Sequence, residues 1–401
     1  MSVVEVLSEF LSCLTREITS LLRDGLFIAF TTLLAIHLLI NGGYLAYMSK
    51  ASRRPWDLQL SEGYEPSVTI IVPAYREAKI IERKIENIAE LDYPRHKLQV
   101  IIVGDAETLE VARRRVHLLE GAKTVLIEEK ERLGKARALN RALRLAEGEI
   151  VATSDADAMW SRDALRSAVR YFSDPRIAAV TGSEIIANAY KNVHTYSEHL
   201  YRRVYYTLRL GESKIGSTMI FQGELALYRR KDLKFFEERP GFSDDTGTVI
   251  RLIREGRRCI YVPEAKFADA APPNFKDKIK LKSRRGQHLI FALTEALKFK
   301  IRRELPLAFF MVLANYYTNV LSPLTQSAIP ILLLTSLLRN TSLTILAMIV
   351  MMLAASMFSR RARALTELYV TSTVALLVAL IKTVMGMREA AWEKIESMRE
   401  V

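Results

Sequence analysis

Runs of apolar residues at both ends of the chain constrain its fold more than any other feature. Four runs contain almost no charge: residues 26–48, 305–338, 341–358 and 364–387. A helix that spans a membrane needs about 20 apolar residues, so these runs predict transmembrane helices rather than helices buried in a soluble core. We therefore expect one transmembrane helix at 25–49 and a transmembrane region at 305–387.

The number of spans depends on the run 305–338. At ~1.5 Å per residue, one straight helix of that length would far exceed a ~30 Å hydrocarbon core. Pro323 and Pro330 can break it into an interfacial piece and one span, or into a tight hairpin. We favour one broken span, which gives about four spans in total. Lys50 and the basic residues at 360–363 then lie on the same side as the central domain. The positive-inside bias predicts a multi-pass protein of the plasma membrane with a cytoplasmic central domain.

Two further segments are predicted to lie at the membrane surface. Residues 1–24 place apolar side chains at helical spacing and form an amphipathic helix. Residues 276–303 are rich in Lys and Arg and form basic interface helices, which would contact anionic membrane lipids. The net charge of +13 is concentrated there rather than spread along a groove-binding stripe, so we expect no nucleic-acid partner. Residues 388–401 form a tail.

The central segment, residues 60–275, has the pattern of a soluble α/β domain. Four short apolar runs predict buried strands: 68–72, 98–103, 124–127 and 149–154. Helical patterns follow each of the first three strands. This alternation predicts a Rossmann-like, mostly parallel sheet with helices on both faces.

Acidic residues follow the carboxyl ends of three of these strands. Glu77 follows the first strand, Asp105 the second, and Asp155 and Asp157 the fourth. Ligands of open α/β sheets bind at that edge. Two carboxylates spaced by one residue can share a hard divalent cation with the phosphates of a ligand, which suits a nucleotide-sugar site. The alternative is a simple turn followed by a helix N-cap.

Other residues of this domain have both a functional and a structural interpretation. Pro73, Ala74 and Tyr75 can shape a wall for a base. Lys135, at a predicted helix start, can meet phosphate, or it is an ordinary surface charge. Gly223 permits a close backbone approach to a ligand. Asp244 and Asp245 precede a helix predicted at 249–255; either Ser243 or Asp244 is its N-cap, or a carboxylate there deprotonates an acceptor hydroxyl.

The order of these motifs resembles the membrane-bound family 2 glycosyltransferases of the cellulose-synthase-like type, over about residues 67–287 and the flanking spans. The matching segments are Pro73-Ala-Tyr-Arg-Glu77, Asp105, Gly134-Lys135 with Asn140, Asp155-Ala-Asp157 and Ser243-Asp-Asp245. Within that family the overall match is to a crenarchaeal mannosyltransferase of N-glycan assembly. The resemblance implies a GT-A fold, an inverting displacement and a nucleotide-sugar donor.

The resemblance also implies residue roles. Mn²⁺ or Mg²⁺ would be held by Asp157 and Asp155, and Asp245 would be the general base with Asp244 in support. The remaining donor-binding residues would be Pro73, Ala74, Tyr75, Glu77, Asp105, Lys135, Gly223, Arg284 and Arg285.

One departure decides the expected product. The processive synthases of this family carry a Trp after the base, where this chain has Gly286 in the segment 282–287. We therefore expect transfer of one sugar, mannose from GDP-mannose, to a hydroxyl of a lipid-linked, dolichol-type glycan acceptor. Alternatives are transfer to a polyprenyl phosphate, processive polysaccharide synthesis and, remotely, a non-catalytic membrane scaffold. The sequence leaves the sugar, the base and the oligomeric state open.

Overall fold

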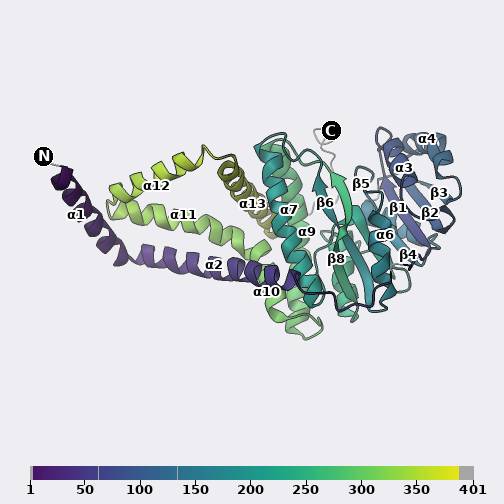
Figure 1. The fold of residues 1–401 in the computed structure, drawn as a ribbon, viewed down its shortest axis with the longest axis horizontal. Coiled ribbons are helices and arrows are strands. Elements are labelled where there is room, and N and C mark those ends of the chain that lie inside the picture. Colours follow the sequence, from purple (N-terminus) through teal and green to yellow (C-terminus); the bar gives the residue numbers. More distant parts are fainter. Residues whose placement is uncertain (1–2, 62, 133, 388–401) are drawn as a thin grey trace.

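A computed structural model describes residues 3–61, 63–132 and 134–387; the predicted tail at 388–401 lies outside them. An α/β domain carries a long helical arm (Figure 1). The arm contains α1 (Val3–Leu22), α2 (Gly25–Ser52), α11 (Ser322–Arg339) and α12 (Leu343–Ser356). Helices α7 (Val193–Ile215), α9 (Phe275–Ile301), α10 (Phe309–Tyr316) and α13 (Arg360–Val384) lie where the arm meets the domain.

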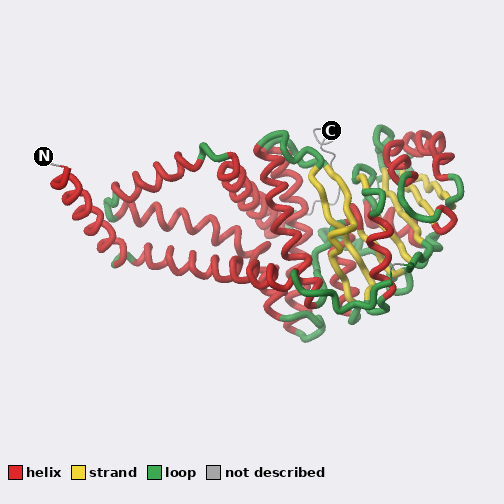
Figure 2. Tube along the Cα trace, in the orientation of Figure 1, coloured by secondary structure: helices red, strands yellow, loops and turns green. Residues whose placement is uncertain are grey.

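One eight-stranded sheet forms the centre of the α/β domain, shown in yellow in Figure 2. Its strand order is β3-β2-β1-β4-β7-β6-β8-β5. The strands are β1 (Val68–Ala74), β2 (Leu98–Gly104), β3 (Lys123–Glu128), β4 (Ile150–Thr153), β5 (Met159–Trp160), β6 (Ile177–Ile186), β7 (Ala226–Arg229) and β8 (Arg258–Asp269). Strands β5 and β7 run antiparallel to their neighbours, and the other pairings are parallel. The predicted, mostly parallel α/β sheet is confirmed.

Both faces of the sheet are buried, because alternate residues of each strand point to opposite sides. On one face Ile70 and Val72 pack with α3 (Ile81–Ala89), α4 (Ala106–Arg115) and α6 (Ala164–Val169). On the other, Ile71 packs with α5 (Lys135–Leu143), α8 (Asp244–Arg254) and α9. The near-continuous apolar strands of the sequence reflect this two-sided core.

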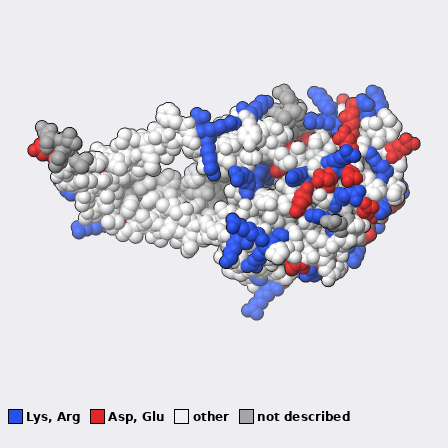
Figure 3. Space-filling view, viewed as in Figure 1, with Lys and Arg blue, Asp and Glu red and all other residues white. Residues whose placement is uncertain are grey.

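The arm has the composition of a membrane domain. Among the described helices, three are long and apolar enough to cross a membrane: α2, the segment Phe309–Arg339, and α13. On the face shown in Figure 3 the arm is almost uncharged, and Lys and Arg gather where it meets the α/β domain.

Two expectations about the arm are corrected. The third predicted span, 341–358, forms α12, whose 14 residues extend ~21 Å, short of a ~30 Å core. Over residues 3–387, apart from 62 and 133, the helices long and apolar enough to cross a membrane thus number three rather than about four. The basic segment 276–303 forms one continuous helix, α9, rather than several.

The long run 305–338 is interrupted at one point along its length. Residues Tyr317–Leu321 are π-helical and separate α10 from α11, directly before Pro323. Pro330 lies inside α11 and does not end it. A proline cannot donate to the carbonyl one turn earlier, and a π-helical stretch accommodates such a defect within a longer helix.

Candidate active site

Three adjacent parallel strands deliver the predicted site residues to one edge of the sheet. Strands β2, β1 and β4 pair in register and end at Gly104, Ala74 and Thr153. Pro73 and Ala74 are the last residues of β1, and Tyr75 follows them. Asp105 follows β2, and Asp155 follows β4. Parallel pairing therefore brings together side chains that are far apart in the chain.

The loop after β1 is fixed to Asp105. The backbone N–H of Arg76 and the Thr108 hydroxyl both donate to Asp105 Oδ1, the latter over 2.7 Å, and Thr108 Oγ1 accepts from the Glu77 N–H over 2.9 Å. Arg76 has a φ of 59°, a conformation that costs energy outside glycine. Burial would raise the pKa of Asp105, but these hydrogen bonds lower it overall. Asp105 is thus held as an ionised acceptor at the sheet edge.

Lys135 joins the strand-end carboxylates to α8. It is the first residue of α5, and its Nζ lies 2.5 Å from Asp155 Oδ1 and 3.8 Å from Asp244 Oδ2. Burial opposes the charge, but Asp155, Asp244 and Glu224 raise the pKa of Lys135. The functional interpretation of Lys135 therefore has a geometric basis: a cation bridges acidic residues from two separate segments.

Asp244 and Asp245 lie in the first turn of α8, which begins at Asp244 rather than at the predicted residue 249. Ser243 is the N-cap, and its Oγ accepts from the Thr246 N–H. Asp245 takes part in the same turn, because its Oδ1 accepts from the Ser243 hydroxyl and from the Thr246 N–H. Burial and the charge of Asp244 raise the pKa of Asp245 to about 7, against the lowering effect of Lys135.

Gly223 lets the two halves of the site approach each other. A Cβ atom at this position would lie 3.0 Å from Lys135 Nζ and 3.2 Å from Asp245 Oδ2. Both distances are tighter than ordinary van der Waals contact. A side chain at this position would therefore force Lys135 and Asp245, two of the predicted site residues, to shift.

Asp157 supplies a further carboxylate next to Asp155. Burial, followed by the charges of Asp155 and Glu77, raises the pKa of Asp157 to about 6. Concentrated negative charge of this kind favours a bound cation, and carboxylate oxygens are the donors that Mg²⁺ and Mn²⁺ prefer. Within the described parts of the chain, no three His, Cys, Asp or Glu side chains are arranged to hold a metal ion.

A second charged layer lies beyond these residues. On α9, Arg285 Nη2 lies 2.8 Å from Glu224 Oε1, while Arg284 is half-buried beside it. Arg202 of α7 lies 2.7 Å from Glu184 of β6. Of this layer, sequence reasoning anticipated only the two α9 arginines. Glu224 adjoins Gly223, so the motif around Gly223 could have pointed to it. Nothing in the sequence near Glu184 or Arg202 marks either residue as part of the site.

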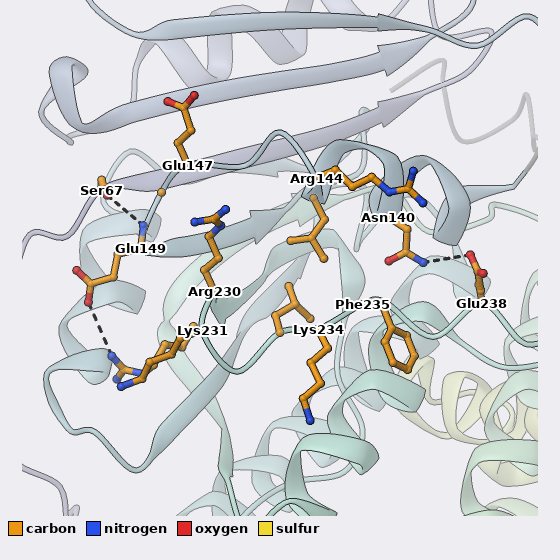
Figure 4. Close-up of a pocket in the computed structure, with 14 residues that line it drawn as sticks. Ser67, Asn140, Arg144, Glu147, Glu149, Arg230, Lys231, Lys234, Phe235 and Glu238 are labelled. Atoms are coloured by element: carbon orange, nitrogen blue, oxygen red, sulfur yellow. Dashed lines mark hydrogen bonds and ion pairs between the residues drawn. The ribbon is translucent and has the colours of Figure 1, made fainter.

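A separate pocket of about 750 Å³ lies at the opposite end of β4 (Figure 4). It is lined by Ser67, Asn140, Arg144, Glu147, Glu149 and residues 229–231 and 233–235, among others. Asn140, which the sequence associated with the Gly-Lys motif, donates to Glu238 and the Phe236 carbonyl here. None of the predicted donor-binding or catalytic residues lines this pocket. Opposite charges converge instead in the strand-end cluster, where Lys135 lies between Asp155 and Asp244.

The strand-end carboxylates, the bridging lysine and the acidic first turn of α8 lie together on an α/β scaffold, as the resemblance to family 2 glycosyltransferases implies. Residues 66–287 match the family described as glycosyltransferase like family 2, and the chain belongs to that family.

Among solved structures, a mannosyltransferase from Pyrobaculum calidifontis, in complex with GDP-Man and Mn²⁺, is similar to this chain. It is 31% identical, with a TM-score of 0.73, over 89% of this chain and 98% of that one.

Curated relatives act on other sugars. An N-acetylglucosaminyltransferase of Bradyrhizobium diazoefficiens is 27% identical over 55% of this chain and 48% of its own length. A beta-monoglucosyldiacylglycerol synthase of Nostoc is 33% identical over 33% of this chain and 29% of its own length. The chain thus spans about half or less of the curated relatives it matches. The predicted family is confirmed, and the sugar is a separate question.

Proposed function

We propose that this protein transfers one sugar, mannose from GDP-mannose, to a hydroxyl of a lipid-linked glycan at the membrane. The transfer is inverting, metal-dependent and non-processive, and belongs to the assembly of an N-glycan or a related glycoconjugate. The observation that carries the proposal is the convergence of Lys135, Asp155 and Asp244 with Asp245 across Gly223. That arrangement supports a base next to a diphosphate site.

Asp245 is the proposed general base. A carboxylate with a pKa near neutrality is ionised in half or more of the molecules at physiological pH, yet basic enough to accept the proton of an attacking hydroxyl. Asp244 sustains that basicity by its negative charge. Lys135 forms an ion pair with Asp155 in the donor-free protein. It would pair with a phosphate of the donor once the donor binds.

Asp155 and Asp157 are the proposed protein ligands of a Mn²⁺ or Mg²⁺ ion. The donor diphosphate would supply further ligands to the same ion. The bound ion would neutralise charge on the leaving nucleotide. Asp105 and the wall formed by Pro73, Ala74 and Tyr75 would hold the base and ribose. The Glu77 N–H donates to Thr108, whose hydroxyl donates to Asp105, so Glu77 would help to hold the loop after β1 against Asp105. Arg284 and Arg285 are assigned to the donor or lipid phosphates.

The choice of mannose rests on the Pyrobaculum mannosyltransferase, whose described complex contains GDP-Man and Mn²⁺ and which aligns with most of this chain. Packing at Gly286 supports single transfer. A Cβ there would lie 3.0 Å from Leu376 Cδ2 and 3.3 Å from Ala379 Cβ of α13. The tryptophan that processive relatives are expected to carry at this point has no room between α9 and α13.

The membrane helices argue for a lipid-linked, dolichol-type acceptor. Three apolar helices hold the catalytic domain close to a bilayer, and the basic helix α9 lies beside them. We place the catalytic domain on the cytoplasmic side of the plasma membrane, because basic residues flank α2 and α13 at the end nearest that domain.

Asp245→Asn tests the hydroxyl-acceptor mechanism. Removing the general base should lower kcat/KM by about 10²- to 10⁴-fold, with donor binding retained. Transfer would be measured with full-length protein, GDP-mannose, Mn²⁺ and a lipid-linked acceptor, and products would be sized. Asp163→Asn, the same change at an exposed position of the domain, is the control.

Three results would contradict the proposal. Near wild-type turnover by Asp245→Asn would point to an already ionised polyprenyl-phosphate acceptor. Long polymers would point to a processive synthase. Absence of metal-dependent turnover with a panel of GDP-, UDP- and dTDP-sugars would point to a non-catalytic scaffold.

A further inference from the structure

Glu129, the residue directly after β3, carries a buried carboxylate that lacks a hydrogen-bond donor. The residue is 5% exposed, and its Oε1 is enclosed and accepts no hydrogen bond from the described part of the chain. A buried acceptor that stays unpaired costs free energy, so such a group in a folded protein calls for an explanation. A ligand that supplies N–H groups at this point would provide one.

Strand pairing places Glu129 beside the proposed nucleotide site. The last residues of β1, β2 and β3 are register partners of one another. The Glu129 N–H donates to the Gly104 carbonyl over 2.8 Å and so extends this ladder by one residue. Neighbouring strands are ~4.8 Å apart. The residues that follow the three strands, Tyr75, Asp105 and Glu129, therefore stand next to one another along one edge of the sheet.

The Glu129 side chain lies on the α5 side of the sheet. In β3, Val125 and Ile127 pack on that side, and Glu129 continues the alternation. Burial raises the pKa of Glu129, and the charge of Arg141 on α5 opposes the rise. Arg141 itself donates to a backbone carbonyl of β3 over 2.8 Å. Because α5 begins at Lys135, the unpaired carboxylate and the proposed phosphate-binding lysine lie on the same side of this edge.

A carboxylate at the edge of a nucleotide site favours one base over the others. Guanine presents its N1–H and an N2–H side by side, so the two oxygens of a carboxylate can accept from both at once. Uracil presents a single N–H between two carbonyl oxygens, and these oxygens would face the carboxylate. Adenine and cytosine present an acceptor nitrogen beside their amino group. A base that leaves a buried polar group unpaired is rejected strongly, so a carboxylate selects guanine.

We propose that Glu129 is the base-specificity residue of the nucleotide site and accepts the N1–H and N2–H of guanine, so that the donor is a guanosine-diphosphate sugar. This assignment rests on the proposed function, in which the nucleotide lies at this edge of the sheet. Asp105 Oδ1 already accepts from the Arg76 N–H and the Thr108 hydroxyl. The second oxygen of Asp105 is then left for the ribose hydroxyls.

Nucleotide binding to the full-length protein tests the assignment. Isothermal titration calorimetry with Mn²⁺ would measure the affinities of wild type, Glu129→Gln and Glu129→Ala for GDP and for UDP. Glu129→Gln keeps the shape of the side chain but turns one acceptor oxygen into an NH₂ group, which meets the N–H groups of guanine. Glu128→Gln is the matched control, because it makes the same change at the neighbouring, exposed residue of β3. Thermal unfolding checks that each variant is folded.

Wild type should bind GDP more tightly than UDP. Both Glu129 variants should lose about 10- to 100-fold in GDP affinity, the range for one bidentate contact to a base, and keep their UDP affinity. The control should bind both nucleotides like wild type. Unchanged GDP affinity in folded Glu129→Gln, or an equal loss for GDP and UDP, overturns the assignment and leaves the proposed function standing. Wild type that binds neither nucleotide, or prefers UDP, overturns the proposed GDP-mannose donor as well.

Discussion

Asp245 shows how a single residue acquires chemistry from its surroundings. An isolated aspartate is too weak a base to activate a sugar hydroxyl efficiently, because the ideal catalytic pKa lies near the working pH. Here burial and the adjacent Asp244 raise the pKa to about 7. Gly223 contributes to this environment, since a Cβ atom at this position would lie 3.0 Å from Lys135 Nζ and 3.2 Å from Asp245 Oδ2, and both side chains would have to shift.

The pH dependence of turnover should report this residue. The base works only when it is ionised, so kcat/KM should fall as the pH drops through about 7 and reach a plateau above it. Asp244→Asn removes the neighbouring negative charge that raises the pKa of Asp245. The midpoint of the acidic limb should therefore move to lower pH, even though the maximal rate also falls.

This prediction is checked by kcat/KM profiles of wild type, Asp244→Asn and the exposed control Asp163→Asn. The control should keep the wild-type midpoint. A midpoint that stays in place, or moves to higher pH, in Asp244→Asn would show that the acidic limb belongs to another group.

Many of the individual site residues could be predicted from the sequence, because a short apolar run is enough to show where a strand of a parallel sheet ends. Each strand-end carboxylate follows an apolar run, so Glu77, Asp105, Asp155 and Asp157 could be assigned to one edge. Lys84 could not. Its spacing from Ile81 and Ile88 puts it on the apolar face of α3, but its hydrogen bond to the Ala158 carbonyl is set by tertiary packing that the local sequence does not encode.

At the scale of elements, the strands and helices up to β4 follow from the sequence, whereas only part of the second half of the sheet does. Strand β6 and helix α7 were not anticipated. Helix α7 buries charged residues, including Arg209 and Glu212, which lie 2.9 Å apart. Buried ion pairs look like surface residues in a sequence, since their partners are fixed only by tertiary structure.

Close helix contact gives an element-scale prediction. At Gly211 of α7 a Cβ would lie 2.5 Å from the Met48 carbonyl oxygen and 2.9 Å from Met48 Cα of α2. Backbone atoms cannot rotate away, so Gly211→Ala must separate the two helices. Overpacking of this kind costs about 1–3 kcal/mol, more than the ~1 kcal/mol that alanine contributes to a helix. The variant should melt at a lower temperature in detergent.

Gly42→Ala in α2 is the matched control. It is also a glycine inside a helix, but no atom lies within 4 Å of its Cβ position. Helix propensity alone predicts an unchanged or slightly higher melting temperature. If both variants melt alike, the contact between α2 and α7 does not limit stability.

On the scale of the whole molecule, the arm separates α1 from the catalytic domain. Helix α1 lies at the far end of α2, and its Glu17 carboxylate accepts from the N–H groups of Thr344 and Ile345 at the start of α12. These contacts hold the amphipathic helix at the tip of the arm. If α2 crosses the bilayer once, α1 and the catalytic domain lie on opposite sides of it.

Thiol labelling of intact cells tests this arrangement. Cys259 is buried, so a Cys13→Ser background leaves no reactive native thiol. Glu9→Cys on the exposed side of α1 should react with a membrane-impermeant maleimide from outside, because α1 faces the external surface when the catalytic domain is cytoplasmic. Glu110→Cys, on exposed α4, should react only after lysis. Labelling of both positions from the same side would contradict a single crossing by α2, and external labelling of Glu110→Cys alone would invert the proposed orientation.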